Sequence, residues 1–203
     1  MKRRMHVTRG KGLLEGFLAR QRWKIANRMI PKEYRNGRIL DIGCGAYPLF
    51  LLNTDFSEKY GIEKTFLKKD EALFRKNNLT VIHWNLEENH HLPLLDDYFD
   101  VVTMLAVFEH IEPGKLIDIL NEIHRILKPD GLFVMTTPAG WTDSLLRIMA
   151  SIGLVSRIEI EEHKDAYTHR KLLSFLHETK FPMDTIRCGY FEIFSNLWLV
   201  AKK

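Results

Sequence analysis

The sequence predicts an α/β protein with a doubly wound, mostly parallel sheet of about seven strands and helices on both faces. Short apolar segments alternate with segments of helical period from residue 38 onward, which is typical of strand–helix–strand units. The segment 99–105, FDVVTML, is nearly all apolar, as expected for a central parallel strand buried on both sides. Residues 183–203 indicate two strands around a turn, which is an antiparallel pair at one edge.

The individual elements follow from the spacing of apolar residues. Apolar side chains recur at roughly helical spacing over residues 13–30, and Pro31 ends that helix. After it we expect strands at 38–43, 58–63, 79–84, 99–107 and 132–138, and helices at 65–76, 116–127, 141–154 and 168–179. The polar stretch 158–167 separates the last two helices, and the final turn is expected near residues 191–196. One domain is the economical interpretation, with residues 1–37 as a basic extension and residues 38–203 as the body.

Composition excludes several classes of protein. The chain of 203 residues is 45% hydrophobic and 28% charged, which is near the globular average. No apolar run approaches the roughly 18 residues of a membrane span, and no secretory signal is recognisable, so we expect a cytoplasmic protein. The two cysteines give neither a disulfide framework nor zinc-ligand spacing.

A glycine-containing turn at the end of the first strand carries most of the chemical information. Residues 38–48, RILDIGCGAYP, place Asp41 at the strand end, before Gly43, Cys44 and Gly45. Glycines allow a tight turn and let a ligand approach the backbone. Glu63 ends the second strand about twenty residues later, where an acidic side chain can accept hydrogen bonds from ribose hydroxyls.

A nicotinamide cofactor is the weaker interpretation of this turn. The dinucleotide motif needs a third glycine where this chain has Pro48, and Asp41 would repel a pyrophosphate. An acidic strand end instead suits a cationic group such as an ammonium or a sulfonium.

Four segments in order resemble the class I S-adenosylmethionine-dependent methyltransferases, in particular the "type 11" small-molecule group. They are LDIGCG, the strand end GIE, LPLLDDYFDVVTMLAVFEHI and LKPDGLFVMTTP, between about Arg38 and Pro138. The resemblance implies a Rossmann-like fold and S-adenosyl-L-methionine as cofactor. It implies methyl transfer to a small-molecule or lipid- or sugar-linked acceptor by direct in-line displacement. A NAD(P)-dependent oxidoreductase and an inactive cofactor-binding module are the alternatives.

The resemblance also assigns cofactor contacts. Asp41 and the segment 43–45 would face the methionine moiety, and Glu63 would hold the ribose hydroxyls. Asn85 and Leu86 match the place of the adenine contact, where many members of the family have Asp. Leu105 would line the floor beneath the sulfonium. Pro48 departs from the usual glycine, so the following helix is expected to begin there.

Candidates for catalysis and acceptor binding are fewer. Glu109 and His110 follow the fourth strand at the carboxyl edge of the sheet, where a base can act, although a structural role in the turn before Pro113 is favoured about two to one. Further acceptor-pocket candidates lie in the segments after the fifth strand: Trp141, His163, Tyr167 and His169. The pair His163 and His169 lacks the helical spacing of a zinc site, so no metal is expected.

The positive charge is concentrated at the N-terminus. Residues 1–38 hold twelve Lys and Arg against Glu15 and Glu33, although the whole chain carries only +4. We expect the helix over 13–30 to cover the cofactor site. Peripheral contact of residues 1–30 with an anionic membrane is a further interpretation, and nucleic acid is considered unlikely because no RNA-binding module accompanies the charge. The sequence leaves the oligomeric state open.

Overall fold

The computed structural model describes residues 14–65, 71–89, 91–161 and 163–203. Within them, one sheet of seven strands has the order β3-β2-β1-β4-β5-β7-β6, with the last two pairings antiparallel and the others parallel. This confirms the predicted fold class. The strands are β1 (Arg38–Ile42), β2 (Glu58–Glu63), β3 (Leu79–His83), β4 (Phe99–Leu105), β5 (Leu127–Pro138), β6 (Arg187–Phe191) and β7 (Asn196–Lys202).

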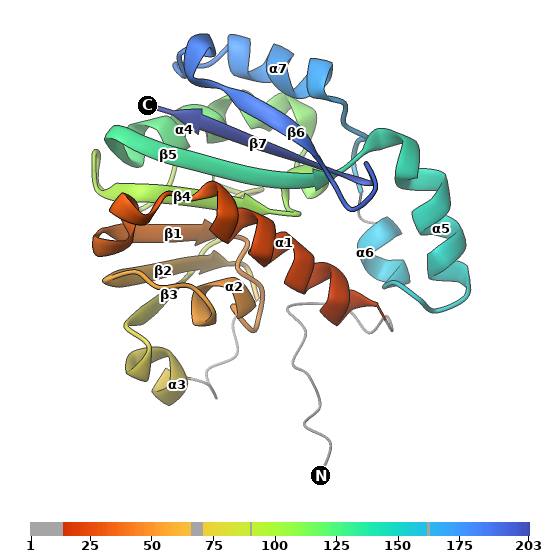
Figure 1. Cartoon of the computed structure of the whole chain (residues 1–203), viewed down its shortest axis with the longest axis horizontal. Helices are drawn as coiled ribbons and strands as arrows, with labels where there is room; N and C mark the ends of the chain where they lie inside the picture. Colours follow the sequence, from red (N-terminus) through yellow and green to blue (C-terminus); the bar gives the residue numbers. More distant parts are fainter. Residues whose placement is uncertain (1–13, 66–70, 90, 162) are drawn as a thin grey trace.

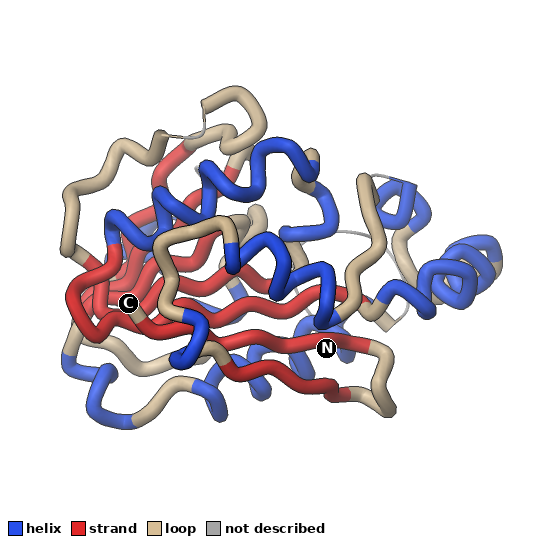
Figure 2. Tube along the Cα trace, turned by 90° about the horizontal axis from the view of Figure 1, so that it is seen from above, coloured by secondary structure: helices blue, strands red, loops and turns tan. Residues whose placement is uncertain are grey.

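Helices cover both faces of the sheet, as Figure 2 shows from above. On one face, α1 (Glu15–Met29), α2 (Leu49–Leu52) and α3 (Glu71–Lys76) contribute buried residues to the core cluster that includes Ile39 and Val101. On the other face, α4 (Leu116–Ile126) and α7 (His169–His177) pack against the cluster that includes Leu40 and Met104. Alternating side chains of β1 and β4 therefore belong to two separate cores, one on each face of the sheet.

Two helices stand apart from these layers. In Figure 1, α5 (Asp143–Ser151) and α6 (Arg157–Glu161) lie beyond the carboxyl ends of the parallel strands, and α1 crosses the front of the sheet toward them. Ligands of open α/β sheets bind at the carboxyl ends of the strands, so α1, α5 and α6 surround the expected site.

The predicted elements agree with the structure in kind and differ at boundaries. The turn between the last two strands lies at residues 192–195, inside the expected segment. The strand predicted at 132–138 begins earlier, at Leu127, because Leu127 already pairs with Phe99 of β4 before an irregular segment that ends where Leu132 pairs with Val101. The polar stretch 158–167, which was not expected to be helical, contains part of α6. Residues 1–13 of the basic extension and 66–70 of the predicted third helix lie outside the described residues.

Candidate functional site

The glycine turn brings the ends of β1 and β2 together. Gly43 and Gly45 have φ angles of 72° and 77°, a region that side-chain-bearing residues rarely occupy. The amides of Gly43 and Cys44 both donate to the carbonyl oxygen of Ile62, at 2.8 and 3.1 Å. A Cβ atom at Gly43 would lie 2.4 Å from Cγ2 of Val107, so glycine is required there for space as well as for conformation. The next helix begins at Leu49, one residue later than expected, and Pro48 is its N-cap residue.

Asp41 is a buried carboxylate at the base of this turn. Burial raises the pKa of Asp41 to about 7, against the hydrogen bond from Oγ1 of Thr103 to Oδ1 at 2.7 Å, which lowers the pKa. The nearby Glu63 charge raises it further. A buried carboxylate in this state is poised to ionise when a cation comes next to it.

Glu63 is buried at the end of β2 and faces the same turn. Its Oε2 accepts a hydrogen bond from the amide of Gly45 at 2.9 Å, and its Oε1 accepts one from the amide of Thr65 at 3.1 Å. A carboxylate oxygen can accept more than one hydrogen bond, so the same group is suited to bind ligand hydroxyls. The backbone therefore fixes the carboxylate in the position where the sequence predicts a ribose contact.

A pocket of about 830 Å³ of empty space, open solvent included, lies over these groups. Six of the predicted cofactor residues line it: Gly43, Gly45, Glu63, Asn85, Leu86 and Leu105. The other two, Asp41 and Cys44, line a smaller adjoining pocket that extends beneath α1. The Cys44 thiol is buried, and burial raises its pKa, which agrees with a filler rather than a nucleophile.

The side chain of Asn85 forms hydrogen bonds within its own turn. Its Oδ1 accepts from the amide of Glu87 at 3.1 Å, and its Nδ2 donates to Oε1 of Glu88 at 2.7 Å. The apolar walls next to it, Trp84 and Ile111, were not predicted from the sequence. An aromatic and an aliphatic side chain on a pocket wall are suited to contact with a planar base.

Arg22 is the functional residue that sequence reasoning missed. It lies on α1 and lines the cofactor pocket, the smaller adjoining pocket and a second large pocket. Among the described residues its buried Nε has no hydrogen-bond partner. Its only sequence signal was its place in the basic helix, where Arg20, Lys24 and Arg28 are exposed but Arg22 is not.

The second large pocket shares Arg22, Ala106 and His110 with the cofactor pocket. It contains about 770 Å³ of empty space, open solvent included, and most of its wall is apolar: Leu18, Leu145, Leu146, Met149, Val155 and Ile160. Ala106, at the junction, has a φ of 55°, a strained conformation of the kind that collects at functional sites.

Glu109, His110 and His163 meet at the junction of the two pockets. The side chain of Glu109 is buried, its Oε2 accepts from Oγ1 of Thr137 at 3.0 Å, and burial raises its pKa. The rings of His110 and His163 are 5.1 Å apart between centroids. Burial lowers the pKa of His163, while the charge of Glu109 opposes that shift.

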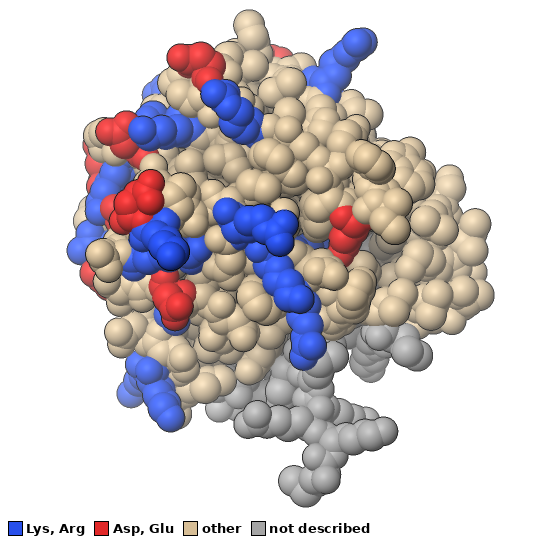
Figure 3. Space-filling model, in the orientation of Figure 1, with Lys and Arg blue, Asp and Glu red and all other residues tan. Residues whose placement is uncertain are grey.

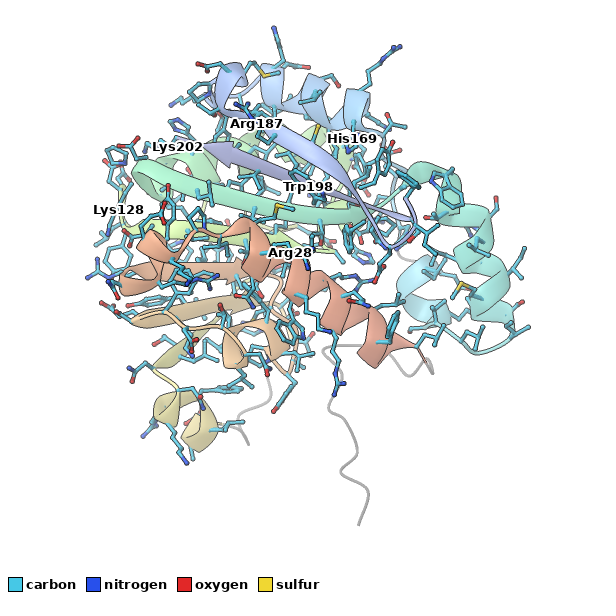
Figure 4. All side chains as sticks on the ribbon, in the orientation of Figure 1. Arg28, Lys128, His169, Arg187, Trp198 and Lys202 are labelled. Carbon is cyan, nitrogen blue, oxygen red and sulfur yellow. The ribbon has the colours of Figure 1, made fainter. Side chains whose placement is uncertain are left out.

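The other acceptor candidates lie elsewhere. Tyr167 is fully buried and packs its ring 5.0 Å from that of Phe108. His169 lies beside β6, where its Nε2 is 3.0 Å from the carbonyl oxygen of Gly189 (Figure 4). Neither is among the residues that line the two large pockets.

Trp141 is 60% exposed and donates from Nε1 to the carbonyl oxygen of Phe194 at 3.0 Å. It therefore ties the start of α5 to the β6–β7 turn and does not line either large pocket.

The strand order and the acidic ends of β1 and β2 define an α/β protein that binds a nucleoside-containing cofactor at the carboxyl edge of its sheet. Residues 40–135 match the methyltransferase domain family. These residues therefore resemble a methyltransferase domain, and solved structures that share the fold include S-adenosylmethionine-dependent methyltransferases, which implies S-adenosylmethionine as the cofactor. The nicotinamide interpretation is thereby set aside.

Solved structures share this fold across nearly the whole chain. A SAM-dependent methyltransferase from Archaeoglobus fulgidus has a TM-score of 0.63 at 19% identity and covers 92% of this chain and 93% of that one. A Haloferax volcanii methyltransferase, solved in complex with the activator Trm112, has a TM-score of 0.66 at 16% identity, with 92% of each chain covered.

Curated relatives match only part of their length. An uncharacterised protein of Methanocaldococcus jannaschii is 32% identical over 111 residues, which are 53% of this chain and 44% of the relative. A tRNA N(3)-cytidine methyltransferase of Mus musculus is 26% identical over 125 residues, which are 55% of this chain and 31% of the relative. The chain thus spans less than half the length of these relatives.

Proposed function

We propose that this methyltransferase acts on a small acceptor with an apolar part, such as a lipid-linked molecule, which enters the second pocket. The observation that carries the proposal is the apolar wall of that pocket together with its junction to the cofactor pocket at Ala106 and His110. An apolar ligand portion buried there gains roughly 25 cal/mol per Å² of surface removed from water. The acceptor's polar atom then faces Glu109, His110 and His163.

The transfer is a single displacement. The acceptor's nucleophilic atom forms a bond to the methyl carbon while the bond from that carbon to the sulfonium sulfur breaks, which leaves a neutral thioether. Because the methyl group is already activated, the protein's main tasks are alignment at about 3–3.5 Å and exclusion of water. Glu63 and Asp41 are proposed to hold the cofactor, and the junction residues to position the acceptor.

Exposed apolar side chains surround the end of the molecule that carries the second pocket. On α5 they are Leu145, Ile148 and Ile152, and the neighbouring β6–β7 turn adds Ile193 and Phe194. On the face in Figure 3, almost no charged side chain covers this end. Several exposed apolar side chains on neighbouring elements are typical of contact with a protein or a membrane.

Basic side chains on α1 favour an anionic membrane as the contact. Arg20, Lys24 and Arg28 repeat at four-residue spacing and are exposed, so they form one stripe along the helix. In Figure 3 a row of Lys and Arg side chains crosses the front of the molecule beside the uncharged end. At about 1 kcal/mol per basic residue near an anionic surface, the stripe adds about 3 kcal/mol, or roughly 100-fold in affinity. Among the described residues, no helix is long and apolar enough to cross a membrane.

An RNA acceptor is the competing outcome, since curated relatives include tRNA methyltransferases. The exposed Arg147 of α5 and Arg157 of α6 are paired with Asp143 and Glu161, and the other exposed side chains of α5 are uncharged, whereas RNA binding needs Lys and Arg that are available to phosphates. This observation favours the apolar acceptor.

One set of reactions tests the acceptor. The full chain is incubated with S-adenosylmethionine labelled in the methyl group, together with a lipid extract, a polar small-molecule extract or bulk tRNA. Label in the lipid fraction supports the proposal, and label in the tRNA fraction alone contradicts it.

Vesicle flotation tests the membrane contact separately. Ile148→Glu and Ile152→Glu are expected to lose binding to phosphatidylglycerol vesicles, whereas the matched control Leu95→Glu, in an exposed loop away from α5, keeps it. Phosphatidylcholine vesicles are expected to bind roughly 100-fold more weakly than anionic ones. Equal binding by all three variants would refute the contact.

A further inference from the structure

Three side chains of types that bind metal ions lie close together, although their spacing along the chain does not indicate a metal site. One ligand atom from each of Glu109, His110 and His163 lies within 4.8 Å of the other two. Glu109 and His110 belong to the short turn after β4, and His163 follows α6, so the fold itself brings them together.

The spacing is close to that of a bound ion. Ligand atoms at about 2.1 Å from a tetrahedral metal lie about 3.4 Å apart, so movements of less than about 1 Å close the cluster. His110 and His163 line the wall of the second pocket together with Glu109, so an ion held by all three keeps coordination positions that are open toward that pocket.

A second carboxylate supports His163 from behind. Nδ1 of His163 lies 3.9 Å from Oδ1 of Asp143, which is longer than a hydrogen bond, so a small movement of either side chain would bring the two atoms into contact. Histidines that bind metals usually donate their other ring N–H to a carboxylate, which fixes the tautomer and the ring orientation. Asp143 thus stands in the place of such a supporting group.

Charged side chains of both signs surround the cluster. Glu109 is buried, and the hydroxyl of Thr137 donates a hydrogen bond to its carboxylate. Arg22, from α1, lines the same pocket and is a positive group near Glu109. Asp143 is itself paired with Arg147 at 2.8 Å, so Glu109 is the carboxylate that would directly balance a bound cation.

We propose that Glu109, His110 and His163 bind one divalent transition-metal ion at the junction of the two pockets. Two imidazole nitrogens and one carboxylate oxygen favour zinc, cobalt, manganese or iron over magnesium and calcium, which prefer oxygen ligands alone. This replaces the expectation that the chain holds no metal, which rested on spacing along the sequence.

The role of the ion rests on the proposed function. An acceptor hydroxyl bound to the ion loses its proton to water more readily, because the metal stabilises the oxyanion. That oxygen then bonds to the methyl carbon as the bond to sulfur breaks. The ion would therefore select acceptors with an oxygen nucleophile at the end of an apolar body.

Metal titration tests the site without any acceptor. The full chain is treated with a chelator, dialysed, and titrated with Zn²⁺ by calorimetry and with Co²⁺ by visible absorption. One equivalent is expected to bind, and Mg²⁺ is expected to bind far more weakly. His163→Ala and Glu109→Gln should lose the stoichiometric binding, and Asp143→Asn should weaken it about tenfold.

Controls separate the site from general effects. His177→Ala removes an exposed histidine at the end of α7 and should bind Zn²⁺ like the parent chain. Each variant must keep the parent's affinity for S-adenosylhomocysteine, which shows that the chain is folded. Zn²⁺ binding that survives both His163→Ala and Glu109→Gln, or no stoichiometric binding to the parent chain, would overturn the inference.

The two proposals fail differently. If lipid acceptors are methylated but the parent chain binds no stoichiometric Zn²⁺, the metal inference is wrong and the proposed function stands. If one equivalent of Zn²⁺ binds but label enters only tRNA, the acceptor proposal is wrong and the metal site stands.

Discussion

Asp41 offers a sharp test of cofactor binding because its ionisation couples to the ligand. Burial raises its pKa to about 7 in the cofactor-free chain. An ammonium group beside it favours the carboxylate, so binding of S-adenosylhomocysteine should expel the proton. We therefore expect the affinity for S-adenosylhomocysteine to rise with pH through 7.

The size of the effect follows from the pKa. If only the ionised form binds well, the apparent affinity at pH 8 is close to its maximum and at pH 6 is about tenfold lower. Asp41→Asn should remove this dependence and bind weakly at both values. Near pH 6, binding to the parent chain should release close to one proton per ligand.

The same ionisation has a consequence for stability. Between pH 3.8, the ordinary value for Asp, and about 7, the folded chain holds a proton at Asp41 that the unfolded chain has lost. The free energy of unfolding therefore falls as pH rises, by about 1.36 kcal/mol per unit and about 4 kcal/mol in all from this residue. Asp41→Asn should lack this contribution.

Calorimetry in buffers of different ionisation enthalpy measures both affinity and proton release. 5′-Methylthioadenosine is the matched ligand, since it keeps the nucleoside but lacks the amino-acid end. Its affinity should be independent of pH between 6 and 8. A flat profile for S-adenosylhomocysteine, or an equal slope for both ligands, would refute the assignment of Asp41 to the ammonium.

Three further predictions concern the groups around Asp41. Thr103→Val removes the 2.7 Å hydrogen bond to Asp41 and should shift the affinity profile to higher pH by about one unit; an unshifted profile would contradict the role of that bond. Glu63→Ala should weaken S-adenosylhomocysteine and 5′-methylthioadenosine alike, by about 100-fold from two charge-assisted hydrogen bonds, as measured by calorimetry; undiminished binding would place the ribose elsewhere. Gly61→Ala would place a Cβ atom 2.6 Å from Sγ of Cys44 and should cost about 1–3 kcal/mol in thermal unfolding, whereas Gly114→Ala, with no atom within 4 Å, should be neutral; equal midpoints for the two would refute the packing argument.

The cofactor half of the site could be predicted from the sequence because its parts are local. The turn at 43–45 lies next to Asp41, and Glu63 ends the next strand, so period and spacing alone place them together. Strand pairing then dictates that the carboxyl ends of β1 and β2 meet.

The meeting of Glu109, His110 and His163 could not be predicted, because these residues come from segments that are distant in the chain. His163 reaches Glu109 only because α5 and α6 fold back over the end of the sheet. α6 has five residues, too few for a helical period to show in the sequence. Tyr167 was a candidate for the acceptor pocket, but its backbone forms a bridge to Ala139 and its ring lies in the core.

The placement of Arg22 explains why a basic helix covers an acidic turn. The smaller adjoining pocket has Asp41 on its floor and Arg22 on the wall formed by α1, so it offers one charge of each sign. The methionine end of the cofactor carries an ammonium, which would pair with Asp41, and a carboxylate, which would pair with Arg22. A carboxylate there would also satisfy the buried Nε of Arg22.

Arg22→Met, which keeps the apolar stem, should weaken binding of S-adenosylhomocysteine about 10- to 100-fold, the value of a charge-assisted hydrogen bond. Binding of 5′-methylthioadenosine should be unchanged. Lys24→Met, on the exposed side of the same helix, is the matched control and should affect neither ligand. An equal loss for both ligands in Arg22→Met would mean that the residue holds α1 in place and does not bind the carboxylate.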